Sequence, residues 1–559
     1  MTDFVLALHS HLPYVLHHGR WPHGSDWLCE AALDTYLPLL EQLRALERDG
    51  VDAPVTIGVT PVLGNQLASP AFAAELEAFF SQRLEACDEA GASLATTGDE
   101  HLLPLATYWR ERFVRLRELF HAIGGDIVGA LGGLERRGRL EIISSAATHG
   151  FLPLLARDES IALQLLVGRE EHRRLFGRAP TGCWLPECAY RPRGPWEPLP
   201  GERRVALRRG TDEHLAAAGF RYFFTDANLA QAGEWLGAYG DVPLGAERFD
   251  AERRDRPTHT AARAVRTPYR AYSMPARPGS RNVAALVRDP RSSMQVWSRH
   301  RGYPGDGAYL EFHKIRWPGG LKYWRVTGPD TDLGAKQPYD PAAAQSCAAD
   351  HAGHFAWLLG QIAAEQRGAA VIVAPFDTEL FGHWWFEGVD FIAELYRRLR
   401  GSQAVRPVTA EQHVAAHPPR ALLRLAAGSW GAGGDFGMWL NDDTAWTWRR
   451  LWPLEEAFWD AAPAALRSEA ARPVLAQAAR ELLLAQASDW QFIMSTGAVT
   501  DYAERRFSLH CDDAESLVAA LAPGPDPAAL ESAQRRAEEL ARRDDLFPDV
   551  LAGVAAALA

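Results

Sequence analysis

The stretch AAVIVAPFDTELFGHWWFEG, residues 369–388, decides how the fold is read. It opens with an uninterrupted apolar run, 369–374, which is typical of a strand buried on both faces in a parallel sheet covered by helices. Asp377 and Glu379 follow the run almost at once. In parallel α/β folds, polar residues at the carboxyl ends of strands face the ligand crevice. The stretch therefore predicts an α/β fold with Asp377 beside a ligand.

The same pattern of an apolar run followed by a helical segment recurs along the first 400 residues. Six further candidate strands lie at 4–8, 55–59, 140–144, 182–185, 221–225 and 283–287. The clearest helical segments between them are 71–90 and 108–134. Seven strands alternating with helices predict an α/β architecture that can close into a barrel, with an open doubly wound sheet as the alternative.

Two connections are too long for plain loops, 226–266 and 289–340, and such insertions usually carry function or form a small subdomain. After about residue 402, helices rich in Ala, Leu and Arg dominate, for example 472–487 and 527–543. We predict a catalytic barrel over 1–401 that includes an inserted subdomain at about 226–266 and the connection 289–340. A helical domain over 402–559 is expected to contribute to the active-site groove.

Composition excludes several function classes. A chain of 559 residues suggests about two or three packed units. With 59 basic against 71 acidic side chains, the formal charge of −12 argues against nucleic-acid binding. The only lysines are Lys314, Lys322 and Lys336, and none stands in the Gly-Lys-Ser/Thr of a phosphate-binding loop. The glycine-rich run 431–434 follows no clear strand and is a weak nucleotide signal.

Nothing in the sequence indicates secretion or membrane insertion. The first residues, MTDFVLALHSH, lack a basic segment and a cleavage site, and no run approaches the roughly 18 apolar residues of a membrane span. The six cysteines contain no C-x-x-C pair. Scattered thiols in a large chain favour a reduced state, so we expect a cytoplasmic location and no membrane partner.

Five of the predicted strands end in residues whose side chains can act in catalysis or ligand binding. These residues are His9, His11, His149, Glu187, Arg288, Asp289, Asp377 and Glu379. His9 and His11 are two apart and point to the same face of an extended strand. That spacing suits a pair of metal ligands, a site for sugar hydroxyls, or simply a polar strand end.

Glu187 and Asp377 both sit in aromatic surroundings, TGCWLPE and APFDTELFGHWW. Partial desolvation favours the neutral form of a carboxyl group, as a general acid requires. Two such carboxyls from different strands, beside a tryptophan-lined surface, fit glycoside cleavage. The alternative is that both are ion-pair partners for the abundant arginines.

Tryptophan is unusually frequent, with 19 residues. Seven stand beside polar or loop segments: Trp27, Trp184, Trp297, Trp384, Trp385, Trp430 and Trp490. Indole rings stack on the apolar faces of sugars, so some should line a groove for a neutral polymer. We expect Trp297 and Trp430 to matter for substrate, and Trp452 and Trp459 to matter mainly for packing.

Six segments carry a resemblance to a known family: HSHLPYV (9–15), ATHGFLPLL (147–155), GCWLPECAY (182–190), APFDTELFGHWWFEG (374–388), SWGAGGDF (429–436) and SDWQFIMSTG (488–497). With them the chain resembles glycoside hydrolase family 57, specifically its 1,4-α-glucan branching enzyme group. The resemblance implies a (β/α)7 barrel with an inserted subdomain and a C-terminal helical domain.

The resemblance also implies roles for individual residues. Glu187 would be the nucleophile and Asp377 the general acid/base of a retaining reaction, with their carboxyl groups about 5 Å apart. The substrate-binding candidates are His9, His11, His149, Trp27, Trp297, Trp430 and Asp489. Tyr239, in EWLGAYGD, would lie on a loop that covers the site and excludes water.

The implied activity is cleavage of an α-1,4-glucan and transfer to a 6-hydroxyl, giving an α-1,6 branch in a glycogen-type polysaccharide. The expected partner is α-1,4-glucan alone, with no metal, cofactor or nucleic acid; no oligomeric state is predicted. An α-amylase or 4-α-glucanotransferase of the same family is the alternative. A metal-dependent polysaccharide deacetylase and a non-catalytic glucan-binding protein are more remote.

Overall fold

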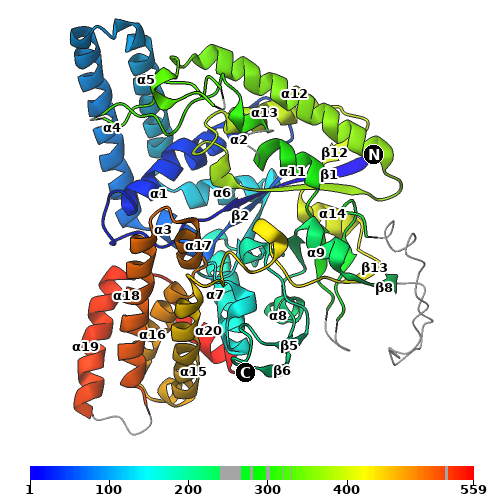
Figure 1. Cartoon of the computed structure of the whole chain (residues 1–559), viewed down its shortest axis with the longest axis vertical. Coiled ribbons are helices and arrows are strands. Elements are labelled where there is room, and N and C mark those ends of the chain that lie inside the picture. The colour runs from blue at the N-terminus through cyan, green and yellow to red at the C-terminus, as the bar shows by residue number, and fades with distance from the viewer. Residues whose placement is uncertain (239–265, 277–280, 298–301, 318, 329, 523–526) are drawn as a thin grey trace.

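The computed structural model describes residues 1–238, 266–276, 281–297, 302–317, 319–328, 330–522 and 527–559. Tyr239 and most of the subdomain predicted at 226–266 therefore lie outside the described residues. Figure 1 shows the strands near the middle of the molecule, with the C-terminal helices grouped to one side and two long helices projecting at the other end.

Seven parallel strands form the barrel, and all seven were predicted from the sequence. Their order is β11-β1-β2-β3-β4-β7-β10. Arg288, just after β10, bridges in parallel to Val373 of β11, and the Asp289 amide donates to the Val373 carbonyl at 2.8 Å. This contact closes the ring and rules out the open sheet. The strands are β1 (Thr2–Ser10), β2 (Val55–Val59), β3 (Leu140–Ser145), β4 (Gly182–Trp184), β7 (Tyr222–Thr225), β10 (Ala284–Val287) and β11 (Val371–Asp377).

Shorter strands extend this framework. β12 pairs with β1, and β9, β13 and β8 continue the sheet beyond β10, while β5 and β6 form a separate pair. Their bounds are β5 (Gly194–Trp196), β6 (Val205–Arg208), β8 (Glu234–Ala238), β9 (Tyr272–Ser273), β12 (Val405–Pro407) and β13 (Ala421–Arg424). Because β12 and β13 follow residue 402, the all-helical part begins later than predicted, at α15 (Ala445–Arg467).

Helices occupy the connections between the strands. Those of the barrel part are α1 (Ser25–Ala31), α2 (Leu37–Arg48), α3 (Pro61–Leu67), α4 (Pro70–Thr97), α5 (Leu103–Ala122), α6 (Ile127–Arg136), α7 (Asp158–Phe176), α8 (Thr211–Ala218), α9 (Ala227–Ala232), α11 (Pro290–Trp297), α12 (Pro341–Glu365), α13 (Gly388–Leu399) and α14 (Ala410–Ala416). After α15 come α16 (Arg472–Ala485), α17 (Asp489–Thr496), α18 (Thr500–Ala519), α19 (Pro527–Arg543) and α20 (Val550–Ala557).

One helix prediction was wrong. The segment 108–134 is not a single helix, because α5 ends at Ala122 and α6 begins at Ile127. Gly124 and Gly125 adopt φ values of +67° and +76°, a left-handed conformation that ends α-helices. Asp126 then caps α6, its carboxylate accepting from the Gly129 amide at 2.7 Å. The predictions at 71–90, 472–487 and 527–543 correspond to α4, α16 and α19.

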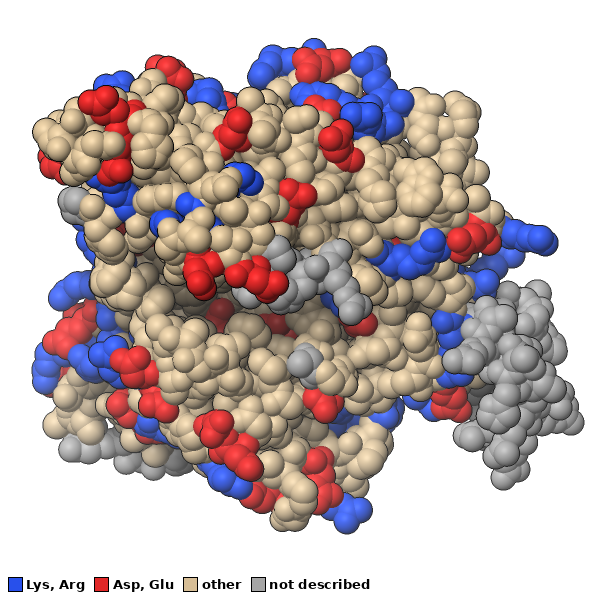
Figure 2. Space-filling model, turned by 45° about the horizontal axis from the view of Figure 1, so that its top comes forward, with Lys and Arg blue, Asp and Glu red and all other residues tan. Residues whose placement is uncertain are grey.

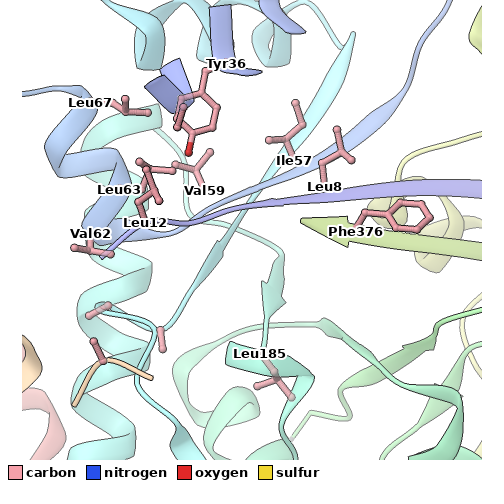
Figure 3. Packing of buried hydrophobic residues seen from close by; sticks show 14 of the residues in the cluster. Leu8, Leu12, Tyr36, Ile57, Val59, Val62, Leu63, Leu67, Leu185 and Phe376 are labelled. Atoms are coloured by element: carbon pink, nitrogen blue, oxygen red, sulfur yellow. The ribbon is translucent and has the colours of Figure 1, made fainter. Parts of the chain in front are cut away.

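The hydrophobic core consists of buried side chains of the barrel strands and of the helices that pack against them. Leu8 of β1 pairs in register with Phe376 of β11 and Ile57 of β2, and Figure 3 shows these side chains together. All nine residues of β1 are buried. In the helical part, Trp452 and Trp459 are buried as predicted, and their indole N–H groups donate to the Leu154 carbonyl and the Ser160 hydroxyl. These two side chains thus join α15 to the barrel.

Candidate active site

The polar strand ends predicted from the sequence meet at one end of the barrel. His9 and Asp377 occupy paired positions on β1 and β11. The His9 ring stacks on Trp184 at 4.6 Å, and its Nε2 lies 2.9 Å from Nε2 of His149. Four strands (β1, β3, β4 and β11) therefore contribute side chains to one cluster.

The backbone at this cluster is strained. His149 and Glu187 both have φ of +59°, and Cys188 has +47°, all in the left-handed region that non-glycine residues seldom adopt. Such conformations persist only where the surroundings enforce them, and they concentrate at functional sites. The Trp430 amide, which donates to the Glu187 carbonyl at 3.1 Å, is one of the contacts that hold this turn.

Two donors hold the Glu187 carboxylate. The Ser488 hydroxyl donates to Oε1 at 3.0 Å, and the Trp430 indole N–H donates to Oε2 at 2.9 Å. Burial raises the pKa of Glu187, whereas these two hydrogen bonds act in the opposite direction because they stabilise the charged form. A carboxylate held by two donors is suited to stay ionised and attack an electrophile.

Asp377 has the contrasting environment. Burial raises its pKa well above the ordinary value, and the charges of Glu379 and Glu187 raise it further, with only Arg288 opposing. Among the described residues, no group donates a hydrogen bond to the Asp377 carboxylate. The pKa values of both carboxyls are raised, but of the two only Glu187 has hydrogen-bond donors that oppose the shift, and this difference is the pattern of an acid and a nucleophile.

The three histidines also differ. Burial lowers the pKa values of His9 and His149 well below the ordinary value, so both rings are neutral. Burial opposes protonation of His11 as well, but the charge and hydrogen bond of Asp489 outweigh it and raise the pKa. The His11 Nε2 lies 3.0 Å from Asp489 Oδ2, and its Nδ1 lies 3.0 Å from the Thr60 hydroxyl. His9 and His149 are therefore neutral hydrogen-bonding groups, whereas the surroundings of His11 favour its protonated form.

His11, His149 and Asp489 also offer ligand atoms within 4.8 Å of one another, which is metal-ligand spacing. Both ring nitrogens of each histidine already have partners, since His149 Nδ1 lies 2.9 Å from the Ser488 hydroxyl and its Nε2 contacts His9. The trio is thus engaged in orienting the site.

Aromatic surface borders the carboxyls. The Trp430 ring meets Trp297 edge-to-face at 5.5 Å, and the Arg288 guanidinium lies 6.0 Å from the Trp430 ring centre. Asp226 pairs with Arg288 at 2.8 Å. Trp297 is 38% exposed, so its ring is available for stacking. Figure 2 shows a hollow across one face of the molecule, with acidic side chains inside it and along its rim.

The other tryptophan candidates differ clearly in solvent exposure. Trp184, Trp385 and Trp490 are almost fully buried and act in packing, whereas Trp384 is 53% exposed. Trp27 lies on α1 beside His23, at 6.1 Å between rings, and no contact among the described residues joins it to Glu187 or Asp377.

Sequence reasoning missed three residues of the site. Ser488 contacts both Glu187 and His149, Thr60 contacts His11, and Tyr36 donates to Glu379, whose Oε1 also accepts from the His11 amide at 3.2 Å. The only signal for Ser488 was its position next to Asp489, at the start of the SDWQFIMSTG segment.

Comparison with known proteins agrees with this geometry. The family model of glycosyl hydrolase family 57 matches residues 5–426, and a model described as the C-terminal part of 1,4-alpha-glucan branching enzymes matches residues 453–554. The chain belongs to glycosyl hydrolase family 57. The (β/α)7 barrel with a C-terminal helical part, expected from the resemblance, is therefore the architecture of a family 57 member.

Three known proteins are similar to this chain over nearly its whole length. The 1,4-alpha-glucan branching enzyme TK1436 of Thermococcus kodakarensis is 38% identical, covering 98% of this chain and 78% of that protein. The crystal structure of a GH57-type branching enzyme from Pyrococcus horikoshii has a TM-score of 0.87 and 35% identity, covering 99% and 96% of the two chains. The alpha-amylase AmyC of Thermotoga maritima has a TM-score of 0.79 and 29% identity, covering 98% and 99%.

Proposed function

We propose that this protein is a 1,4-α-glucan branching enzyme that cleaves an α-1,4-glucan with retention and transfers the released chain to a 6-hydroxyl. The observation that carries the proposal is the pair of carboxyls: Glu187 is held by two donors, and the pKa of Asp377 is raised by burial and by like charges. The match of residues 453–554 to the C-terminal part of branching enzymes and the 38% identity to TK1436 support transfer as the outcome.

In the proposed first step, a Glu187 oxygen attacks the anomeric carbon while Asp377 protonates the departing glycosidic oxygen. The glucan chain is then covalently bound to Glu187, and Asp377 is ionised. In the second step Asp377 takes the proton from an acceptor 6-hydroxyl, whose oxygen attacks the anomeric carbon. The bond to Glu187 breaks, both carboxyls return to their starting states, and an α-1,6 linkage is formed.

The neighbouring side chains supply binding and orientation. We assign His9, His11 and His149 to the donor-sugar side of the site, where a sugar hydroxyl would replace one of their present hydrogen-bond partners, and Trp297 and Trp430 offer stacking surface. Tyr239, which lies outside the described residues, keeps its proposed role on a loop that excludes water. Water attacking in place of the acceptor would give hydrolysis, so exclusion of water favours transfer.

The test is incubation of the purified protein with amylose, followed by debranching and measurement of new chains against reducing ends. Branching predicts more new chains than reducing ends. The E187Q and D377N proteins are each expected to lose nearly all activity, since either change removes a group that reacts in both steps. Near-normal turnover of either variant would show that these carboxyls are not the catalytic pair.

Hydrolysis is the second candidate, because the alpha-amylase AmyC covers 98% of this chain at a TM-score of 0.79. The same assay separates the two activities. A hydrolase produces reducing ends with every cleavage and leaves no chains to be released by debranching.

The proposal also covers the cellular location of the enzyme and its product. Among the described residues, no helix has the length and apolar character needed to cross a membrane. All six cysteines are unpaired, which supports a reducing, cytoplasmic location. We assign the branched product to a glycogen-type storage polysaccharide, with no nucleic acid as partner.

A further inference from the structure

A second cluster of chemically active side chains lies on α12, apart from the catalytic carboxyls. Cys347 and His351 are four residues apart on this helix and therefore share a face. Asp306 follows the short helix η5 (Tyr303–Gly305) and faces them. One ligand atom from each residue lies within 4.8 Å of the other two, and all three side chains are partly exposed.

One distance within the cluster, between His351 and Asp306, is wider than hydrogen bonding and close to that between ligands around one ion. His351 Nε2 and Asp306 Oδ2 are 3.9 Å apart, beyond hydrogen-bond distance. Zinc binds nitrogen and oxygen ligands at about 2.0–2.2 Å, so an ion between these atoms requires only a small adjustment. The Cys347 sulfur lies 3.8 Å from His351 Nδ1.

The other nitrogen of His351 already has the partner that a metal-binding histidine needs. The Tyr309 hydroxyl lies 2.6 Å from His351 Nδ1. With the proton on Nδ1 donated to the Tyr309 oxygen, the Nε2 lone pair faces Asp306. Hydrogen bonds of this kind fix the tautomer and ring orientation of histidines that bind metals.

The local charge also favours a cation. Asp306 and Asp350 are the charged groups that act on the Cys347 thiol, and both are negative. The described residues contain four such groups of possible ligands. In two of the others an arginine already neutralises the carboxylate, Arg406 on Asp3 at 2.7 Å and Arg543 on Asp544 at 2.7 Å. The fourth is the His11, His149 and Asp489 trio of the active site.

We propose that Asp306, Cys347 and His351 form a binding site for a borderline divalent ion of the Zn²⁺ class. A thiolate, an imidazole and a carboxylate are the ligands such ions take, and solvent supplies a fourth position at this exposed place. Binding breaks the Cys347 S–H bond, forms a sulfur–metal bond and releases the proton to solvent.

The site would connect α12 to a wall of the barrel. Tyr309 and Tyr303 pack against Trp385, with ring centres 5.5 and 6.2 Å away. Trp385 lies in the segment that follows Asp377. A bound ion would therefore stabilise the position of this segment through Tyr309 and Tyr303. It would not take part in the reaction of Glu187 and Asp377.

Titration of the full-length protein with Co²⁺ provides a direct test, since a cobalt–thiolate bond gives a charge-transfer absorption that histidine and carboxylate ligands do not. Cys347 is the only one of the six cysteines that is not buried. We expect one equivalent of Co²⁺ to give this band and Zn²⁺ to abolish it. Calorimetry in buffers of different ionisation enthalpy should show about one proton released per ion.

Variants assign the ligands. C347S should lose the band and H351Q should bind Co²⁺ more than tenfold more weakly, while Y309F should cost about 10- to 100-fold in affinity. H354Q is the matched control, because His354 lies on the same helix but contacts the Tyr303 hydroxyl at 2.7 Å. It should bind Co²⁺ as the native protein does, and thermal melting verifies that all four variants fold.

No thiolate band, a band that persists in C347S, or unchanged affinity in H351Q would overturn the site. None of these readouts depends on glucan chemistry, so the outcome is independent of the proposed branching activity.

Discussion

At the scale of single residues, the two carboxyls proposed to be catalytic, Glu187 and Asp377, are distinguished by what contacts them rather than by their own chemistry. Ser488 and Trp430 favour the ionised form of Glu187, and burial with like charges favours the neutral form of Asp377. The division of labour between nucleophile and acid is therefore adjustable by changing neighbours alone.

We predict that S488A raises the pKa of Glu187, because it removes one of the two hydrogen bonds that stabilise its charge. The acidic limb of the pH profile of kcat/KM should move to higher pH, since less Glu187 is ionised at low pH. A hydrogen bond to a charged group contributes about 1.5 kcal/mol, so activity should fall about tenfold. T496A is the control on the same helix, since Thr496 is exposed and bonds only to Ile493. Matching pH profiles for S488A and the native protein would contradict this account of Glu187.

The sequence was sufficient to single out Glu187 and Asp377 as candidates at strand ends, because each follows an apolar run. It was not sufficient for Ser488, a common residue type brought to Glu187 from 301 positions away by packing of α17 against the barrel. The same limit applies to Asp306, whose position facing Cys347 depends on how the connection 289–340 folds over α12. The sequence pattern indicates which polar residues stand at the end of a strand. It does not indicate which residues from distant segments contact them, because those contacts form only in the tertiary structure.

At the scale of elements, the segment after β1 is fixed by the C-terminal helices. The Tyr14 carbonyl accepts from Arg506 of α18 at 2.7 Å, and His18 Nε2 lies 2.6 Å from Asp544. The His18 and Asp544 side chains are 4% and 0% exposed. Since His11 lies on this same segment, the packing of the helical part sets the position of a histidine in the site.

We predict that D544A destabilises the protein by about 3–5 kcal/mol, because it removes a fully buried carboxylate that bonds both His18 and Arg543 and leaves His18 Nε2 buried without that acceptor. R505A removes a pair on α18 whose side chains, Arg505 and Asp501, are 75% and 79% exposed. It should cost no more than about 1 kcal/mol. Urea unfolding of both variants measures the difference. Equal losses would mean that the buried cluster contributes nothing beyond surface ion pairs.

Elements were predictable in proportion to their length and regularity. The seven barrel strands are buried and mostly apolar, and all were found. The break between α5 and α6 depends on two glycines, Gly124 and Gly125, within otherwise helical periodicity. Strands β12 and β13 have three and four residues, and they are strands because of pairing with distant partners, β1 for the former and β8 and β9 for the latter. The boundary predicted at residue 402 was early for that reason.

At the scale of the whole molecule, the site is complete only when both parts of the chain pack together. The barrel supplies Glu187, Asp377 and the three histidines, while the helical part supplies Ser488 and Asp489. The net charge of −12 and the acidic side chains at the hollow in Figure 2 suit a neutral polymer, which requires no positive field. The tryptophans fall into two groups by position. Trp297 and Trp430 lie beside the site, whereas Trp452 and Trp459 are buried and pack in the core.

At this scale, three buried glutamates should each make the protein less stable as the pH rises from about 5 to about 8. Burial raises the pKa values of Glu141, Glu387 and Glu455 to about 7. In the unfolded chain a glutamate titrates at about 4.3, so between these values the native state holds protons that the unfolded state has released. Each such group therefore stabilises the fold at low pH, and the contribution is lost as the pH rises through 7. The slope is at most about 1.4 kcal/mol per pH unit for each group.

We predict that E387Q flattens this dependence. Glu387 Oε1 accepts from the Tyr339 hydroxyl at 2.7 Å and from the Leu310 amide at 3.0 Å, whereas Oε2 is buried without a partner among the described residues. Glutamine keeps the accepting oxygen and cannot ionise, so the variant should exceed the native protein in stability at pH 8 and match it more closely at pH 5. Unfolding free energies measured across this range test the sign. E531Q is the control, because Glu531 is 68% exposed and should leave the slope unchanged. If E387Q and E531Q show the same pH dependence as the native protein, protonation of Glu387 does not contribute to stability in this range.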